Sequence, residues 1–212
     1  MLAFDIETTG LNRYRDRITC ACAYDPDRGI AAKFIFRTFI EPGSGGEDDP
    51  EAFMRLLDEA PTLSAFNGVN FDIPFICAHW RVHPARAGGW ARKLVDVFHT
   101  CKKGIDRTFS LNALLDKNAL GSKNGCGGNA LVLAREERWD ELAEYCLHDC
   151  VKTWEVTTLP TIVLPFRPER EEPGWVLEGL RFIRTRSGVE QWLTSGSEGT
   201  GLAGHLGLPS YK

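Results

Sequence analysis

The sequence lacks the features that mark several classes of protein. No apolar run approaches the roughly 20 residues that a helix needs to cross a bilayer, and no positively charged leader precedes an apolar segment. The seven cysteines are odd in number, and none of them forms a C-x-x-C pair. We therefore expect an intracellular protein of a reducing compartment such as cytoplasm or nucleus, with buried thiols, no membrane partner and no zinc site.

An overall positive charge, which would favour binding to nucleic acid, is also absent. The formal net charge is −4, and acidic surfaces repel phosphates. Residues 81–107, however, carry seven lysines and arginines against two aspartates. This stretch is either an ordinary solvated loop or a phosphate-contacting surface. The carboxylate motifs described below favour the second interpretation.

The 212 residues, 43% of them hydrophobic, predict one globular domain with a tail. Period-2 and period-3.6 patterns predict strands and helices in alternation, which favours an α/β fold with a mixed central sheet flanked by helices. The expected strands are 2–7, 17–24, 31–40, 62–66 and 94–97, and the expected helices are 50–60, 72–82, one after Ser110, and 138–156. We place the folded domain at 1–165. Residues 166–212 are expected to form a C-terminal extension that is partly ordered at most, in which WVLEGLRFI adds one helix or strand.

Two carboxylates occupy alternate positions of the first predicted strand. Asp5 and Glu7 lie in the first motif, FDIETTGL, and residues two apart on a strand project from the same face. Leu2, Phe4 and Ile6 alternate with them and should face the core. Because two acids on an otherwise apolar strand need cations or solvent, this strand predicts a metal site.

Two further motifs carry polar residues that suit the same chemistry. Asp72 lies in the second motif, FNGVNFDIPF, where it can cap the following helix, bind a metal, or do both. In the third motif, YCLHDC, Tyr145 and Asp149 are four residues apart on a predicted helix and share one flank beside its apolar stripe. His148 points away from this flank, and we expect it to be solvated. Carboxylate oxygens are the ligands that Mg²⁺ and Mn²⁺ prefer.

The three motifs, in this order and with SLNALL between the second and third, resemble the exonuclease motifs of the DEDD superfamily. The match is most similar to the tyrosine (DEDDy) subgroup, as in the exonuclease domains of family B DNA polymerases. Glu144 stands where the other subgroup has a histidine. The resemblance covers residues 1 to about 156 and implies an RNase H-like (DnaQ-like) fold for the domain at 1–165.

The resemblance also implies a two-metal phosphodiester hydrolase. Two Mg²⁺ or Mn²⁺ ions would be held by Asp5, Glu7, Asp72 and Asp149, with Asp5 between them. Tyr145 would orient the attacking water through its hydroxyl. The implied reaction releases nucleoside 5′-monophosphates from the 3′ end of single-stranded or frayed DNA.

Five residues near the motifs are expected to contact substrate: Thr8, Asn67, Asn70, Phe71 and Lys123. The asparagines flank the second motif and can bind a sugar or phosphate, although Asn67-Gly68 also fits a turn. Phe71 can stack on a terminal base, as can Trp80, Trp90 and Phe109, with a core position as the alternative for each aromatic residue. Lys123 can approach a phosphate from GSKNG, or be solvated.

Three functions stay open at this point. The first is the DNA exonuclease, for which any role in proofreading would need a separate polymerase or repair partner. The second is an RNase D-like enzyme that uses the same ligands on RNA 3′ ends. The third is a nucleic-acid-binding or partner-docking module with a decayed site.

Overall fold

A five-stranded mixed sheet forms the centre of the computed structural model. The structure describes residues 1–38, 42–43, 48–102, 108–121 and 128–165, and the backbone of three strands beyond them. The central strands are β1 (Leu2–Thr8), β2 (Ile18–Asp25), β3 (Ile30–Ile35), β4 (Leu63–Ala65) and β5 (Leu94–Asp96). Their order is β3-β2-β1-β4-β5, with β1 antiparallel to β2 and parallel to β4. The predicted α/β class is confirmed.

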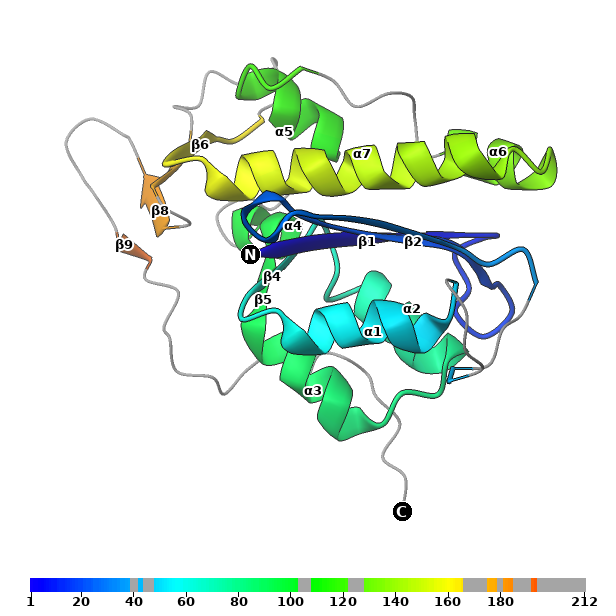
Figure 1. Ribbon diagram of the computed structural model, residues 1–212. Coiled ribbons are helices and arrows are strands. Elements are labelled where there is room, and N and C mark those ends of the chain that lie inside the picture. The colour runs from blue at the N-terminus through cyan, green and yellow to red at the C-terminus, as the bar shows by residue number, and fades with distance from the viewer. Residues whose placement is uncertain are drawn as a thin grey trace.

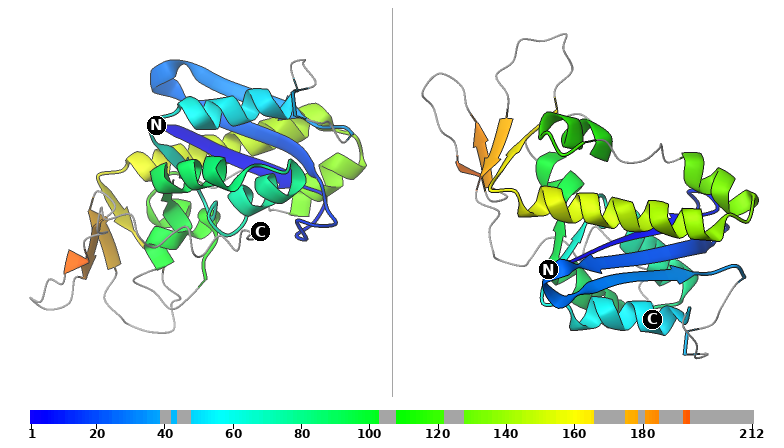
Figure 2. Two further views of the ribbon diagram at one scale, coloured as in Figure 1. Left: turned by 90° about the horizontal axis from the view of Figure 1, so that it is seen from below. Right: turned by 45° about the horizontal axis from the view of Figure 1, so that its top comes forward.

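Helices cover both faces of this sheet (Figures 1 and 2). The helices α1 (Pro50–Glu59), α2 (Asp72–His79) and α3 (Pro84–Lys93) lie on one face, and the long helix α7 (Trp139–Thr158) lies along the other. Leu2, Phe4 and Ile6 are buried in the apolar cluster on the α1–α3 side, as the alternation predicts. The strand β2 is buried along nearly its whole length because both of its faces are covered.

Two polar contacts tie α7 to the sheet. The Cys22 thiol donates to the Ala143 carbonyl oxygen at 3.5 Å. At the penultimate residue of the helix, the Thr157 and Ser64 hydroxyl oxygens are 2.6 Å apart, and both side chains are buried. These contacts fix the position of α7 over β2 and β4. Within the described ranges, neither α7 nor any other helix combines the length and apolar character needed to cross a bilayer.

A second sheet follows α7 in the chain. Four further elements precede α7 in the chain, namely the 3₁₀ helix η1 (Pro26–Arg28) and the helices α4 (Val97–Lys102), α5 (Leu111–Lys117) and α6 (Gly128–Arg135). The sheet comprises β6 (Thr161–Val163), β7 (Trp175–Glu178), β8 (Arg181–Arg184) and β9 (Trp192–Leu193), paired antiparallel in that order. WVLEGLRFI thus supplies two strands. The domain boundary after residue 165 stays a prediction.

Several predicted boundaries differ from the observed ones. β3 ends at Ile35, before the expected residue 40, where the Ile35 amide donates to the Asp48 carboxylate at 3.0 Å; residues 39–41 lie outside the described part. α2 ends at His79, before the expected Val82, because Arg81 adopts a left-handed conformation with φ of 51°. The helices α3, α4 and α6 were not predicted. The helices α3 and α4 lie inside the basic stretch.

Two cations of the basic stretch have structural partners. The Arg86 guanidinium donates to Glu51 at 2.8 and 2.9 Å and to Asp58 at 2.6 Å. The Lys93 ammonium donates to the carbonyl oxygens of Asp58 and Ala60, each at 2.6 Å. These contacts join α3 to α1, so the expected phosphate contact is wrong for both residues. Lys103 and Arg107 lie outside the described residues.

Candidate metal-binding site

The first motif presents its two acids on the α7 face of β1. Asp5, Glu7 and Cys146 form a group whose potential ligand atoms all lie within 4.8 Å of one another. Both acidic residues are half-buried. Because carboxylate oxygens at this separation can share one ion, the group suits a divalent cation, with the hard oxygens as its natural ligands for Mg²⁺ or Mn²⁺.

The second motif is tied to the same strand. Asp72 begins α2, is only 2% exposed, and accepts a hydrogen bond from the Ile6 amide at 3.2 Å. Ile6 lies between Asp5 and Glu7 in the chain. Burial and then the charge of Asp96 raise the pKa of Asp72 to about 7, against the lowering effect of the Ile6 amide. A nearby cation would stabilise the ionised carboxylate in this position, since it would offset both the cost of burial and the repulsion from Asp96.

Asp96 is a residue of this region that sequence reasoning missed. It ends β5, is 4% exposed, and accepts backbone amides from Asn67 at 3.2 Å, Val69 at 2.8 Å and His99 at 2.8 Å. Burial raises its pKa, and these three amides oppose the rise. Asp96 therefore holds the segment between β4 and α2, from which Asp72 projects. The sequence contained one signal that could have identified this residue, namely an aspartate at the end of the apolar run LVD.

The third motif lies on α7 where this helix meets β1. The Cys146 sulfur is 3.5 Å from the Asp5 carbonyl oxygen and 3.6 Å from Asp5 Oδ2. Tyr145 precedes this contact and Asp149 follows it by one turn; they are 7% and 6% exposed. The structure therefore brings the three motifs to one strand. That these residues bind metal or substrate stays a prediction.

A pocket of about 570 Å³ opens beside the third motif, between α6 and α7. Its lining includes Tyr145, Glu144, Arg138 and His148. His148 is half-buried, and its Nδ1 atom is enclosed without a hydrogen-bond partner in the described part of the chain. The expectation of a solvated histidine is wrong, because His148 is three residues from Tyr145 and helical spacing places both beside one pocket.

Two expected substrate contacts have local structural roles. The Thr8 hydroxyl donates to the Gly10 carbonyl oxygen at 2.6 Å, which closes the turn after β1. Asn67 adopts a left-handed conformation with φ of 72°, and its side-chain oxygen accepts from Asn70 Nδ2 at 3.0 Å. The turn interpretation of Asn67-Gly68 therefore holds. Lys123 lies outside the described residues.

Asn70 and Phe71 line a second pocket, of about 480 Å³. The turn after β1 supplies its other wall, including Leu11 and Tyr14, which are 87% and 73% exposed. Phe71 is half-buried, with its ring centroid 5.5 Å from that of Phe75. Of the other aromatic residues considered for stacking, Trp80 and Trp90 belong to the core, and Phe109 packs in a separate apolar cluster near Phe66.

Solved structures with the same arrangement include two that process nucleic acid. One, described as the apo form of the nuclease, aligns over 73% of this chain and 68% of its own, with a TM-score of 0.50 and 20% identity. The family B DNA polymerase from the hyperthermophilic archaeon Pyrobaculum calidifontis aligns over 72% of this chain but only 23% of its own, with a TM-score of 0.51 and 17% identity. At these identities the likeness shows the fold alone.

Sequence comparison assigns the family. No curated protein matches the chain. The family model RNase_H_2, described as RNase_H superfamily, matches residues 2–160. The expected RNase H-like fold is thereby confirmed. The model covers three quarters of the chain, including all three motifs, and the chain belongs to the RNase_H superfamily.

Proposed function

We propose that this protein is a metal-dependent 3′–5′ exonuclease of the DEDDy subgroup that acts on single-stranded or frayed DNA and releases nucleoside 5′-monophosphates. One observation carries the proposal: all three motifs lie on β1 or contact it. Asp5 and Glu7 lie on this strand, Asp72 accepts the Ile6 amide at 3.2 Å, and Cys146 places α7 against Asp5 at 3.5 Å. Membership of the RNase_H superfamily and a structural neighbour described as a nuclease support it.

The residues at this site fit two divalent ions, Mg²⁺ or Mn²⁺. Asp5, Glu7, Asp72 and Asp149 would hold them, and all four offer hard oxygen ligands. Asp72 and Asp149 are 2% and 6% exposed, and buried carboxylates of this kind are tolerated best beside cations. When bound, such ions supply an activated water and stabilise the charge on the leaving oxygen.

Tyr145 is assigned a positioning role towards the attacking water. A tyrosine hydroxyl is neutral at neutral pH, so it donates a hydrogen bond but does not remove the proton. The residue is 7% exposed and lines the pocket between α6 and α7. A hydroxyl in such a position contributes by restricting the orientation of a water molecule.

The second pocket suits the unpaired end of a nucleic acid strand. Leu11 and Tyr14 expose apolar surface beside Asn70 and Phe71, immediately after the strand that carries Asp5 and Glu7. Aromatic side chains such as Tyr14 and Phe71 can stack on bases of any sequence, at about 1 to 3 kcal/mol per base. The preference for DNA follows from the resemblance to polymerase domains, since discrimination depends on contacts with the 2′-hydroxyl.

The deciding experiment compares single-stranded DNA and RNA of matched sequence, labelled at the 5′ end, in Mg²⁺ and in EDTA. We expect a Mg²⁺-dependent ladder that shortens from the 3′ end, with mononucleotides as the released product and faster loss of DNA. Faster loss of RNA would favour the RNase D-like alternative. No metal-dependent product from either polymer would overturn the enzyme and favour the binding module.

A further inference from the structure

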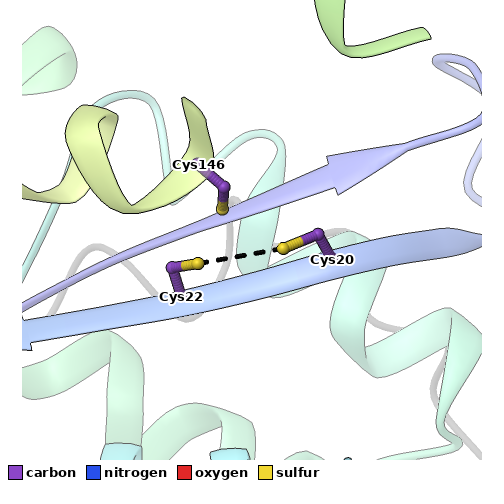
Figure 3. A group of neighbouring side chains, drawn as sticks. All are labelled: Cys20, Cys22 and Cys146. Atoms are coloured by element: carbon purple, nitrogen blue, oxygen red, sulfur yellow. Dashed lines mark hydrogen bonds between the residues drawn. The ribbon is translucent and has the colours of Figure 1, made fainter. Parts of the chain in front are cut away.

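Three buried thiols converge behind the carboxylate site. Cys20 and Cys22 project from one face of β2, and Cys146 projects from α7 towards them (Figure 3). Their sulfur atoms all lie within 4.8 Å of one another, and none of the three residues is measurably exposed. All three are free cysteines. A strand and a helix about 120 residues apart thus bring three soft ligands to one point.

The spacing of the sulfurs suits a metal ion. The Cys20 and Cys22 sulfurs are 3.8 Å apart. A zinc ion that binds thiolates at about 2.3 Å in a tetrahedron separates its sulfur ligands by about 3.8 Å. The helix supplies Cys146 from the other side of this pair, as a third corner. Cys150 follows one turn later on α7 and is equally buried, but it does not belong to the group of three whose sulfurs all lie within 4.8 Å of one another.

We propose that Cys20, Cys22 and Cys146 form a second metal site, which binds a single thiophilic ion of the Zn²⁺ class. Zinc binds cysteine as the thiolate, so binding releases the protons of all three thiols to solvent. The ion with its three thiolates carries one net negative charge, in place of the three charges of the thiolates alone. Thiolate ligands select Zn²⁺ or Cd²⁺ over Mg²⁺, so the carboxylates of β1 and the three sulfurs take different ions.

The proposal differs from the expectation drawn from cysteine spacing. The sequence contains no C-x-x-C pair, and this absence argues against a zinc site built from a local loop. It carries no information on a site whose ligands come from a strand and a distant helix. Only the packing of α7 on β2 brings Cys146 to Cys20 and Cys22.

The test uses Cd²⁺ as a probe on the reduced full chain, without nucleic acid, so its result is independent of the proposed nuclease. Excess Mg²⁺ is present throughout to occupy the carboxylates. We expect the ultraviolet absorption of Cd²⁺–thiolate bonds to saturate at one equivalent. Cys22→Ala and Cys20→Ala should each weaken Cd²⁺ binding at least about 100-fold, because loss of even an outer-shell partner costs about 10- to 100-fold.

Cys101→Ala is the matched control, since Cys101 is a fully buried thiol of α4 outside the cluster. It should bind Cd²⁺ as the wild type does. Circular dichroism establishes that each variant is folded, and Cd²⁺ should raise the thermal midpoint of the wild type more than that of Cys22→Ala. Absence of a saturable thiolate band in the wild type, or equal loss of affinity in Cys101→Ala and both cluster variants, would overturn the site.

Discussion

Asp5 occupies the point where the first and third motifs meet. The Cys146 sulfur lies 3.6 Å from its Oδ2 atom, and Glu7 shares the same face. Asp5→Ala should reduce cleavage about 100-fold or more, because a metal site contributes several kcal/mol to the transition state. Without metal the variant should have a higher thermal midpoint, since one of several crowded carboxylates is gone. Initial rates in saturating Mg²⁺ and thermal scans in EDTA measure both effects.

The control for Asp5 is Asp27→Ala in η1, an exposed carboxylate away from β1. It should change neither the cleavage rate nor the midpoint. Cleavage by Asp5→Ala at the wild-type rate would remove Asp5 from the proposed site.

Tyr145 contributes a hydroxyl and no metal ligand in the proposed mechanism. Tyr145→Phe should lower kcat about 10- to 100-fold, because one oriented hydrogen bond is lost, and should leave the affinity for Mg²⁺ unchanged. Tyr24→Phe is the control, since its ring packs edge-on against Trp154 at 6.0 Å and keeps that contact without the hydroxyl. Mg²⁺ titration of the cleavage rate separates the two effects. A parallel loss of Mg²⁺ affinity would contradict the assigned role.

Local periodicity explains which residues could be predicted. The alternation of Asp5 and Glu7 with apolar neighbours and the four-residue spacing of Tyr145 and Asp149 are properties of one strand and one helix, so the sequence contains them directly. Asp96 and Cys20 act through partners that are distant in the chain. Their roles depend on tertiary packing, which no local pattern encodes.

The segment between β4 and α2 positions Asp72 and depends on Asp96. It contains the left-handed Asn67, and it needs Gly68, since a Cβ atom there would lie 2.6 Å from Ala65 Cβ. In the wild type, the two carboxylate oxygens of Asp96 accept hydrogen bonds from the backbone amides of three residues, whereas Asp96→Asn keeps only one acceptor oxygen. We expect a loss of about 1 to 3 kcal/mol in the free energy of unfolding. The Mg²⁺ concentration for half-maximal cleavage should also rise, because Asp72 shifts with the segment.

Asp116→Asn on α5 is the control for Asp96, because Asp116 is exposed. Urea unfolding and Mg²⁺ titration apply to both variants. A stability loss in Asp96→Asn with an unchanged Mg²⁺ requirement would limit Asp96 to a structural role.

The C-terminal part of α7 depends on a pair of buried hydroxyls. Thr157→Val keeps the shape of the side chain but removes the partner of Ser64, whose hydroxyl oxygen is now 2.6 Å from that of Thr157. The free energy of unfolding should fall by about 1 to 3 kcal/mol, because Ser64 is buried. Thr158→Val is the adjacent control, since Thr158 is exposed and, among the described residues, donates to carbonyl oxygens of its own helix. Equal losses by urea unfolding would refute the anchoring role.

Helix propensity explains why one element was missed. α3 contains Gly88 and Gly89, which lower the intrinsic stability of a helix by about 1 kcal/mol each relative to alanine. Its formation depends on tertiary contacts, namely the burial of Trp90 and the bonds from Arg86 to Glu51 and Asp58. The strands β1 and β2 and the helix α7 were predictable because their apolar patterns agree with their packing.

Across the whole molecule, the sheet separates two kinds of interior. The α1–α3 side is an apolar and aromatic cluster that includes Phe4, Phe53 and Trp90. The α7 side carries small residues and thiols beside the carboxylates of β1. The first side holds the larger apolar cluster, and the second holds the carboxylates and thiols that are proposed above as ligands for cations. The stability of the metal-free protein should therefore depend on the ionisation of its buried acids.

Asp72 gives this dependence a definite sign. In EDTA its pKa is about 7 in the folded protein, against an ordinary 3.8 in the unfolded chain. Below pH 4 both states hold the proton. Between pH 4 and 7 only the folded state keeps it, so the free energy of unfolding falls as the pH rises, and above pH 7 the loss is complete at up to about 4 kcal/mol.

Urea unfolding in EDTA should therefore give a lower free energy at pH 8 than at pH 5.5, by about 2 kcal/mol from Asp72. Asp72→Asn has no proton to lose and should flatten the profile by that amount, whereas Asp27→Asn should leave it unchanged. Mg²⁺ at pH 8 should restore the free energy of unfolding of the wild type but not that of Asp72→Asn, since an ion that binds only the folded state stabilises that state. If the profiles of wild type and Asp72→Asn were parallel, ionisation of Asp72 would not oppose folding.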